Sequence, residues 1–358
     1  MKVLNVVTVT KRLDESVTGA VENVCLWMTR NIFAAHEDCR IVTMPEKGAG
    51  ACKKVVQNVR VMLKILFLIL KNEDVVFIYP TLPLYPATSD IKYRLATAYY
   101  RLLRAVKGKS RIFTYILDLP KEQEESFGLK RIKINKDKLL EFEDMLFSMS
   151  DKVIAASSGF KELVVMRGYS YAESIEVVPV ALKVEADSRK EEEKIRIFYS
   201  GELTRSFEKN TIKKIAETLT DAKLVICGRN GEWINDEKLI NAEYMGYVDT
   251  KTHDRIAKSC DFAIVCYPNE GYYKYVTPSK LCTYIGLALP ILSIKTDTIS
   301  EFFEEYKVGE CVEAEDFVEC VSKWCADKTF LDYENSYKEL DFYEVTIEKL
   351  RRVLSISE

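Results

Sequence analysis

The stretch Lys274–Pro290, KYVTPSKLCTYIGLALP, tells most about how this 358-residue chain folds. We expect Thr277, Pro278 and Ser279 to begin a helix, because proline at the first helical position gives up an N–H that would have no intrahelical partner there. A short apolar strand, Pro290–Ile294, should follow the helix. This order of helix and strand is typical of alternating α/β folds.

The start of this expected helix is also a candidate anion site. Free backbone N–H groups and the positive end of the helix dipole point outward there, so the position favours a phosphate. Lys280, next to Ser279 in the first turn, adds a positive charge that can pair with phosphate. An ordinary capped helix that supports a sheet is the competing interpretation, and spacing alone leaves both open.

Apolar runs alternate with amphipathic stretches along nearly the whole chain, which is the pattern of a doubly wound parallel sheet. In the first half we expect strands at Val3–Val9, Arg40–Met44, Asp74–Tyr79, Arg111–Leu117, Lys152–Ala156 and Ile175–Val178. Helical patterns lie near Gly19–Ala35, Val55–Lys71, Ile91–Val106, Asp137–Met149 and Gly159–Arg167. In the second half we expect strands at Ile195–Ser200, Lys223–Cys227, Ala242–Met245, Phe262–Cys266 and Pro290–Ile294. Further helices are expected at Glu208–Leu219, Thr250–Ser259, Ser279–Gly286, Phe317–Ala326 and Glu344–Leu354.

The segment Val184–Lys194 interrupts this alternation. It is highly charged and lacks apolar periodicity, so we interpret it as a linker. The sequence therefore predicts an α/β chain with two doubly wound, Rossmann-like domains, residues 1–185 and 186–340, and a C-terminal helix within 341–358. Ligands of such folds bind at the carboxyl ends of the strands, in a crevice expected here between the domains.

Two residues that follow strands in the first half are candidates for the site. Gly19 precedes a helical pattern, so its backbone could approach a ligand closely, although a plain strand–helix connection is the alternative. Asp118 follows an apolar strand and could act as a general base or hold an acceptor hydroxyl, and a helix N-cap is its competing role. We expect Pro120 to end regular structure beside it.

The strand expected at Ile195–Ser200 leads into a loop that could hold a diphosphate. Gly201 allows close backbone approach at the strand end. Arg205 and Lys209 are cations four residues apart that could grip phosphates together, the arginine through two hydrogen bonds and the lysine as a point charge. Two solvated surface cations are the alternative.

Two later loops could contribute to the same site. Gly228 follows the strand that ends at Cys227. Tyr247 and Val248 come after another strand end and could hold a flat base through backbone contacts. Each loop alone is weak evidence.

The cysteines and histidines exclude several kinds of chemistry. None of the ten cysteines forms a Cys-x-x-Cys pair, and most stand in apolar segments, as do Cys227, Cys260, Cys266 and Cys282. This usage fits buried free thiols in a reducing cytosol rather than disulfides or zinc ligands. With only His36 and His253 in the chain, a Ser-His-Asp triad or a histidine-rich metal site is not expected, and a carboxylate should carry any proton transfer.

Charge is divided unevenly along the chain. Residues 1–185 hold 28 basic and 22 acidic residues, a net of +6, whereas residues 186–358 carry a net of −9. The basic half could face an anionic acceptor or a membrane surface, and a scatter of solvated surface charges is the favoured alternative. Val55–Leu70 is too polar to span a bilayer, and we interpret it as a core-facing helix rather than a membrane-associating one.

Taken in order, these segments resemble those of GT-B fold glycosyltransferases. The resemblance is specific in the second half, in YSGELTRSFEKN, LVICGRNG, YMGYVDTKTHDRIAKSCDFAIV and YVTPSKLCTYIGLALPIL. The first half adds DKVIAASSGFKELVVMRGY and IEVVPV. The chain looks most like bacterial sugar transferases with a Pro-x-Lys-Leu-x-x-Tyr signature, here Pro278, Lys280, Leu281 and Tyr284.

The resemblance implies roles for the candidate residues. The second domain would bind a nucleoside diphosphate sugar, and the first would bind the acceptor, with the final helix returning to it. The expected donor-binding residues are Gly19, Gly201, Arg205, Lys209, Gly228, Tyr247, Val248, Ser279, Lys280 and Tyr284. Asp118 matches an acidic residue after a strand of the first domain and is the expected catalytic residue.

One departure from the family pattern lies at the positions of two glutamates that many of these transferases carry. Many retaining GT-B transferases carry two glutamates separated by seven positions, where this chain has Tyr275 and Thr283. The stereochemical outcome is therefore not carried over. Glu270 is the candidate substitute facing the sugar, and Asp14 is a further candidate base.

The resemblance implies a cytoplasmic glycosyltransferase that moves a sugar from a nucleoside diphosphate, expected to be UDP, to a hydroxyl of a glycan, glycoprotein or lipid-linked acceptor. No Asp-x-Asp motif occurs, so we expect metal independence, and no cofactor, because the nucleotide sugar is a substrate. Homo-oligomers and peripheral contact with the inner face of a membrane are also considered, whereas nucleic acid is not an expected partner. A nucleotide-sugar epimerase and a non-catalytic partner subunit are the alternatives.

Overall fold

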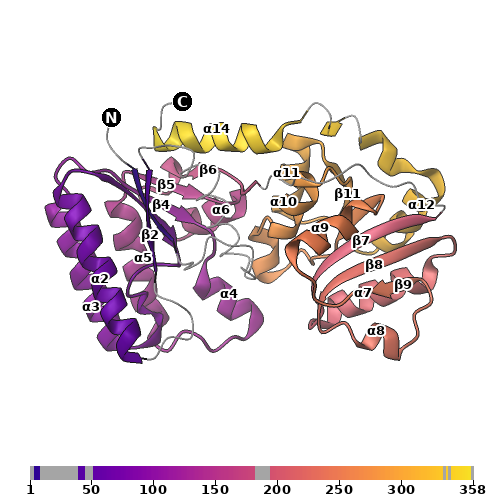
Figure 1. Cartoon of the computed structure of the whole chain (residues 1–358), viewed down its shortest axis with the longest axis horizontal. Coiled ribbons are helices and arrows are strands. Elements are labelled where there is room, and N and C mark those ends of the chain that lie inside the picture. Colours follow the sequence, from indigo (N-terminus) through magenta and orange to yellow (C-terminus); the bar gives the residue numbers. More distant parts are fainter. Residues whose placement is uncertain are drawn as a thin grey trace. The chain divides into compact units, whose positions relative to one another are not determined.

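The computed structural model describes residues 4–8, 39–44, 51–181, 194–333, 336–337 and 340–355. The chain divides into two compact units. The first consists of Met1–Pro179 together with Glu348–Glu358, and the second of Val180–Ile347. Figure 1 shows each unit as a twisted sheet with helices packed against it.

The described part of the first unit contains a parallel sheet of six strands in the order β2-β1-β3-β4-β5-β6. The strands are β1 Leu4–Thr8, β2 Cys39–Thr43, β3 Asp74–Tyr79, β4 Ile112–Ile116, β5 Lys152–Ala155 and β6 Glu176–Val177. Every residue of β3 is buried, which explains the nearly continuous apolar run there, because both faces of this strand are covered.

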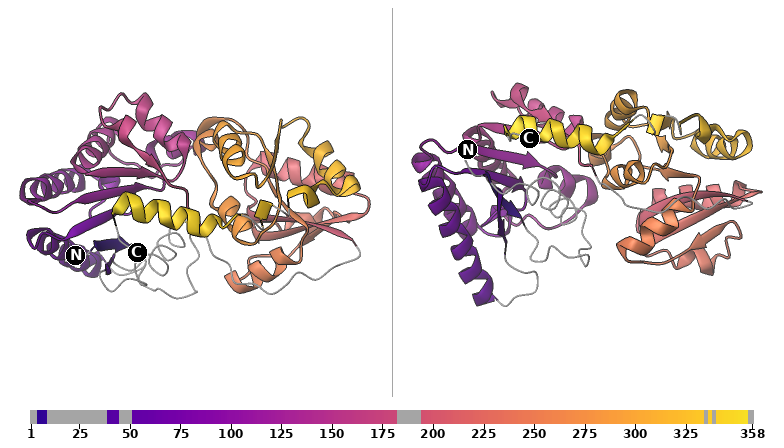
Figure 2. Two further views of the ribbon diagram at one scale, coloured as in Figure 1. Left: turned by 90° about the horizontal axis from the view of Figure 1, so that it is seen from above. Right: turned by 45° about the horizontal axis from the view of Figure 1, so that its top comes forward.

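In the described part of the first unit, helices follow the strands in alternation. They are α2 Ala51–Leu70, α3 Asp90–Val106, α4 Pro120–Phe127, α5 Lys136–Met149 and α6 Ser158–Met166, with short 3-10 turns η2 Pro86–Thr88 and η3 Ala172–Ser174. Helix α3 packs on the sheet through Tyr100, whose ring lies 5.6 Å from that of Phe77. Helix α2 lies beside α3 (Figure 2). The Tyr99 hydroxyl donates a hydrogen bond to the Met62 carbonyl at 2.9 Å.

The second unit also contains a parallel sheet of six strands, in the order β12-β11-β10-β7-β8-β9. The strands are β7 Ile195–Glu202, β8 Ala222–Arg229, β9 Ala242–Tyr244, β10 Phe262–Val265, β11 Ile291–Ile294 and β12 Gly309–Val312. The helices are α7 Ser206–Thr218, α8 Trp233–Asp236, α9 Thr250–Lys258, α10 Ser279–Gly286, α11 Asp297–Tyr306 and α12 Phe317–Asp327. The described residues also include two 3-10 turns, η4 Gly271–Tyr275 and η5 Thr329–Tyr333.

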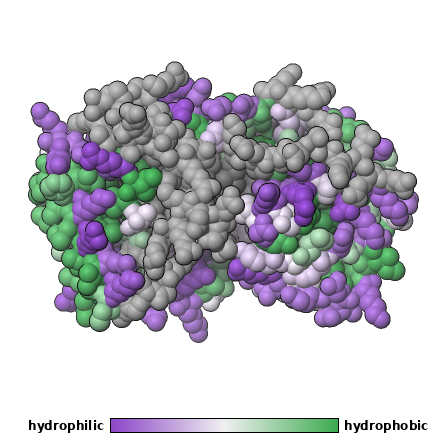
Figure 3. Space-filling model, in the orientation of Figure 1, coloured by the Kyte–Doolittle hydropathy of each residue, from purple (hydrophilic) through white to green (hydrophobic). Residues whose placement is uncertain are grey.

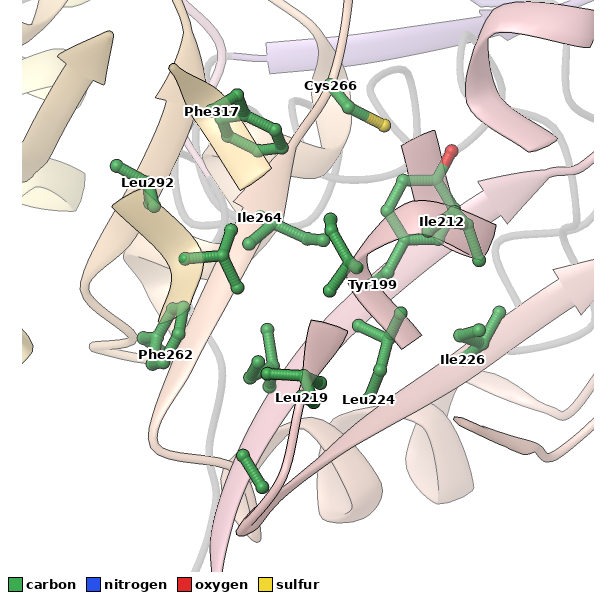
Figure 4. Close-up of a cluster of buried hydrophobic side chains, with 14 of the residues drawn as sticks. Tyr199, Ile212, Leu219, Leu224, Ile226, Phe262, Ile264, Cys266, Leu292 and Phe317 are labelled. Atoms are coloured by element: carbon green, nitrogen blue, oxygen red, sulfur yellow. The ribbon is translucent and has the colours of Figure 1, made fainter. Parts of the chain in front are cut away.

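Alternate residues of β7 point to opposite faces of the second sheet. Tyr199 joins a buried cluster with Ile212 of α7 and Phe317 of α12 (Figure 4). Phe198 points the other way, and its ring lies 5.2 Å from His253 of α9 and 5.7 Å from Tyr284 of α10. Both faces are therefore covered by helices, as a doubly wound sheet requires. The two parallel sheets confirm the predicted fold class.

Helix α14, Phe342–Leu354, is the last element of the chain. Its residues up to Ile347 belong to the second unit, and those from Glu348 onward belong to the first. Ile347, Leu350 and Leu354 are buried at spacings of three and four residues, so one side of the helix is apolar and covered.

Three local expectations are corrected. Pro120 begins α4 instead of ending regular structure, since a proline fits the first turn of a helix. Pro278 is the N-cap of α10, and Ser279 is its first helical residue. The interpretation of Val55–Leu70 as a core-facing helix holds for one side of α2 only: that side is buried, whereas Leu63 and Phe67, among other apolar residues, are exposed.

Candidate functional site

The direction in which successive strands are added to the second sheet reverses between β7 and β10, although all the strands are parallel. From β7 the chain moves outward to β8 and β9, and then returns to β10 on the other side of β7. In open α/β sheets, ligands bind outside the carboxyl ends of the strands at such a switch point. The residues that end β7 and β10 therefore define the candidate site.

Lys280 lies across this switch point. Its Nζ atom lies 4.3 Å from the ring centroid of Tyr199 on β7 and 4.8 Å from that of Tyr267, which follows β10. Nζ also donates a hydrogen bond to the Tyr199 hydroxyl oxygen at 3.3 Å. A Cβ atom on Gly201 would stand 2.9 Å from Nζ, so the glycine lets the ammonium group approach the end of β7.

A buried carboxylate supports the tyrosine beneath Lys280. The Tyr199 hydroxyl donates a hydrogen bond at 2.7 Å to Oε1 of Glu208, which is 2% exposed. Burial, and then the neighbouring Cys266 and Glu208, raise the pKa of Tyr199 well above its ordinary value, so the phenol stays neutral. Lys280 thus rests on aromatic rings and a neutral hydroxyl. Its charge remains available to an anion, because no described carboxylate forms an ion pair with it.

The two helices that begin at the switch point have N-termini without a side-chain cap. Arg205 precedes α7 and Pro278 precedes α10, and neither side chain accepts a hydrogen bond from its helix. By contrast, Asp249 caps α9 and Thr296 caps α11. The first N–H groups of a helix need acceptors, so the starts of α7 and α10 are suited to bind an anion.

Arg205 and Lys209 lie against different aromatic rings. The Arg205 guanidinium lies 4.9 Å from the ring of Tyr273 in η4, whereas Lys209 Nζ lies 5.9 Å from the ring of Trp233 in α8. Arg205 also acts electrostatically on Tyr267, the second ring under Lys280. The structure therefore groups Arg205 with the Lys280 site and places Lys209 towards α8.

The ends of β7, β8 and β9 meet closely beside the site. Gly201 and Gly228 are register partners, and a Cβ atom on Gly228 would lie only 1.7 Å from the Gly201 carbonyl oxygen. The Gly228 N–H donates to the Gly246 carbonyl at 2.9 Å. Glycine is thus required at 228, where φ is +151°. This contact places the loop after β9 next to the end of β7.

That loop presents an exposed aromatic ring. The Tyr247 side chain is 53% exposed, and the Arg229 guanidinium lies 4.3 Å from its ring centroid, while Val248 is half-buried. An aromatic face stacked with a guanidinium is suited to contact a flat base.

Three other predicted residues take different positions. Ser279 is exposed at the first position of α10. Tyr284 is fully buried, and its hydroxyl accepts a hydrogen bond from the Ser200 N–H at 2.8 Å, which ties α10 to β7. Glu270 is exposed and precedes η4.

In the first unit, Asp118 stands two residues beyond β4 and is half-buried. Its Oδ2 atom accepts a hydrogen bond from the Gln123 side chain at 2.9 Å, and Oδ1 accepts one from the Leu119 N–H at 3.1 Å. The carboxylate thus lies at a strand end, as expected, and is held by α4. Gly19 and Asp14 lie outside the described residues.

Sequence reasoning missed Tyr199, Tyr267 and Glu208. A tyrosine within an apolar strand is most simply interpreted as a core residue, and a glutamate in the first turn of α7 as a solvated one. Tyr199 could have been found from the sequence of β7, because neighbouring residues of a strand point to opposite faces and Tyr199 lies two residues before Gly201, near the end of the strand. The buried acidic position has no signal of its own in the sequence.

One groove in the second unit lies apart from the candidate site. A groove of about 780 Å³ runs over β12 and is lined by residues including Lys295, Glu310, Lys323 and Tyr333, but by none of the predicted site residues. Among the described residues, no group of three or more His, Cys, Asp or Glu side chains could hold a metal ion.

No protein-family model matches the chain, and no curated protein matches it in sequence. Solved structures do match its fold. The structure of HepE from Anabaena in complex with UDP is similar with a TM-score of 0.63 and 10% identity, over 99% of each chain. The complex of the same protein with UDP-glucose gives 0.61 and 8%, over 98% of this chain and 100% of that one.

WaaG, a glycosyltransferase involved in lipopolysaccharide biosynthesis, is similar with a TM-score of 0.58 and 10% identity, over 98% of this chain and 99% of its own. At such identities the likeness concerns the fold. Two Rossmann-like units with parallel sheets of six strands are the architecture of GT-B glycosyltransferases, and this chain has that fold.

Proposed function

We propose that this protein is a glycosyltransferase that moves a sugar from a UDP-sugar to a hydroxyl group of a glycan, glycoprotein or lipid-linked acceptor. The observation that carries the proposal is the position of Lys280, which lies at the switch point of the second sheet on two aromatic rings. The uncapped starts of α7 and α10 lie at the ends of neighbouring strands. This combination suits a diphosphate.

The diphosphate leaves the sugar with developing negative charge. Lys280, Arg205 and the N–H groups at the starts of α7 and α10 would stabilise that charge, since fixed donors aimed at a leaving group cost no reorganisation during the reaction. These groups supply positive charge without a metal ion or cofactor, and we propose that neither is needed. The paired Tyr247 and Arg229 would contact the base.

The first unit would bind the acceptor. We propose that Asp118 acts on the acceptor hydroxyl: it removes the proton if the configuration inverts, and orients the hydroxyl if it is retained. UDP is proposed as the nucleotide because HepE, which has the same fold, was solved with UDP and with UDP-glucose. Reducing surroundings suit the buried, unpaired Cys227, Cys260, Cys266 and Cys282, so we place the protein in the cytoplasm.

The test is release of UDP from a panel of UDP-sugars, with and without acceptor oligosaccharides. Lys280→Ala should lower kcat/KM by about two orders of magnitude, the scale for loss of one charged group at a leaving group. Lys214→Ala, which removes an exposed lysine of α7, is the matched control and should leave kcat/KM unchanged.

A second candidate function is a non-catalytic partner subunit. It is favoured by Tyr275 and Thr283, which stand where many retaining relatives carry glutamates. UDP binding without UDP release from any sugar in the panel would support it. A sugar isomer formed without acceptor would instead indicate a nucleotide-sugar epimerase.

A further inference from the structure

The outer side of α2 is apolar and exposed. Its apolar side chains there are 48% to 68% exposed, and they are Val56, Val59, Leu63, Phe67 and Leu70. They recur every three or four residues and so form a single stripe. The opposite side of the helix is buried through Val61, Ile65, Leu68 and Ile69.

Helix α3 continues this exposed surface. Ile91, Leu95 and Leu102 are 72%, 54% and 45% exposed and share one side of α3. The two helices are joined by the hydrogen bond from Tyr99 to Met62. We call the eight exposed side chains on α2 and α3 the outer apolar face. Figure 3 shows hydrophobic side chains gathered at the left of the view, where Figure 1 places these helices.

The charges carried by α2 and α3 themselves are almost all positive. Helix α2 has no acidic residue, and its basic residues are Lys53, Lys54, Arg60 and Lys64. Helix α3 carries Lys92, Arg94, Arg101 and Arg104, with Asp90 as its one acidic residue. Asp90 is bound by Lys138 at 2.7 Å. The two helices thus bring eight basic residues and one paired acidic residue to this part of the surface.

The basic residues flank the apolar stripe. Arg60 and Lys64 each follow a stripe residue by one position, which turns them about 100° around the helix axis. Lys53 lies seven residues before Arg60 and so falls in the same row. An apolar stripe beside a basic row is the pattern of a helix that lies in the plane of a membrane surface.

We propose that the outer apolar face binds the surface of an anionic lipid bilayer, with α2 and α3 lying along it. None of the described helices is long and apolar enough to cross a membrane, so contact through these helices would be peripheral. A second copy of this chain is the less favoured occupant, because pairing two such faces would oppose basic rows of like charge. Anionic headgroups would neutralise those rows. The inference goes beyond the proposed function, because it does not involve the Lys280 site.

Co-sedimentation of the full chain with vesicles tests the proposal. Vesicles of phosphatidylcholine with about one third phosphatidylglycerol should bind the protein at low salt, and pure phosphatidylcholine vesicles should bind it at least about ten-fold more weakly. Raising the salt to about 0.5 M should weaken the anionic binding by a similar factor, because charge contacts at a surface are screened.

Two double variants separate the apolar and basic contributions. Leu63→Ser with Phe67→Ser should weaken vesicle binding at least about ten-fold. Arg60→Gln with Lys64→Gln should weaken binding about twenty-five-fold, from roughly five-fold for each charge. The matched controls lie in the second unit: Ile240→Ser with Leu331→Ser, and Lys214→Gln with Lys251→Gln, should bind as the unchanged protein does.

The changed side chains are exposed, so the variants should fold, and equal melting temperatures would show it. Equal binding to neutral and anionic vesicles, or binding that neither double variant weakens, would overturn the proposal. Light scattering tests whether a second copy of this chain binds the outer apolar face instead. A dimer that Leu63→Ser with Phe67→Ser converts to a monomer, in a protein that does not bind vesicles, would assign the face to a second copy instead.

Discussion

The two units share one architecture, but each surrounds a basic side chain with different groups: carboxylates in the first unit and aromatic rings in the second. In the first unit, Arg167 lies between two carboxylates: it donates to Glu143 at 2.6 Å and to both oxygens of Glu122 at 2.7 and 2.8 Å. In the second unit, Lys280 lies on the rings of Tyr199 and Tyr267. Two carboxylates balance the charge of the first cation, whereas no described carboxylate forms an ion pair with the second, which is why we propose that Lys280 binds an anionic ligand.

This difference is the reason for assigning Arg167 to the fold and Lys280 to the proposed site. Glu143 is fully buried, also accepts a hydrogen bond from the Tyr79 hydroxyl, and has a pKa raised by burial. The neighbouring carboxylates in turn raise the pKa of Arg167, so this cation stays charged. A closed network of this kind fixes packing. An ammonium group at a strand end, beside uncapped helix starts, is instead poised to bind an anion.

The largest expected effect is on stability. Arg167→Ala should lower the free energy of unfolding by about 3–5 kcal/mol, because it leaves Glu143 buried without its partner. Urea unfolding followed by far-UV circular dichroism measures the loss. Arg104→Ala, an exposed arginine of α3, should change stability by less than about 0.5 kcal/mol. Adding Glu143→Gln to Arg167→Ala should recover part of the loss, and a double variant less stable than the single one would show that the ion pair is not the cause.

The next effect concerns Asp118, which is held by the amide of Gln123. Asp118→Asn preserves the shape of the side chain and removes its charge. Sugar transfer should fall about 100-fold or more, the usual scale for loss of a general base, while UDP binding stays the same. Transfer rates under saturating donor, paired with a UDP titration, measure both. Native rates of transfer would move the role to Glu270 or Asp14.

A smaller effect is expected at Tyr199. Tyr199→Phe keeps the ring but removes the hydroxyl that links Lys280 to Glu208, so UDP affinity should fall about five- to ten-fold, the scale of one ordinary hydrogen bond acting through Lys280. Because the raised pKa keeps Tyr199 neutral, this factor should be constant from about pH 6 to about pH 9. Calorimetric titration of both proteins with UDP at several pH values would measure the ratio of their affinities. A ratio that changes across this range would mean that the Tyr199 phenol titrates.

Much of the fold could be predicted from apolar runs. The buried strands β3 and β10 coincide closely with their expected ranges, because strands covered on both faces are apolar throughout. The edge strand β12 was missed, since its residues Gly309–Val312 are only half-buried and include a glutamate. Helix α4 was missed for another reason: Pro120 was taken to end regular structure, although proline is well suited to a first turn.

The site could be predicted only in part. Lys280 and Gly201 were identified because each stands at a recognisable boundary between strand and helix. Arg205 and Lys209, four residues apart, were expected to grip a diphosphate together, and their side chains lie against different rings, Tyr273 for Arg205 and Trp233 for Lys209. The contact of Lys280 with Tyr199 joins residues 81 positions apart, and no local pattern reports such a contact.

The central claim is that Lys280 binds the diphosphate of a nucleotide. Isothermal titration of the protein and of Lys280→Ala with UDP, UMP and uridine tests it most directly, with Lys214→Ala as the control. We predict that Lys280→Ala weakens UDP binding by about 10- to 100-fold and uridine binding by less than about two-fold, because charge-assisted hydrogen bonds contribute about 1.5–3 kcal/mol. Equal losses for UDP and uridine, or unchanged UDP affinity, would contradict the account.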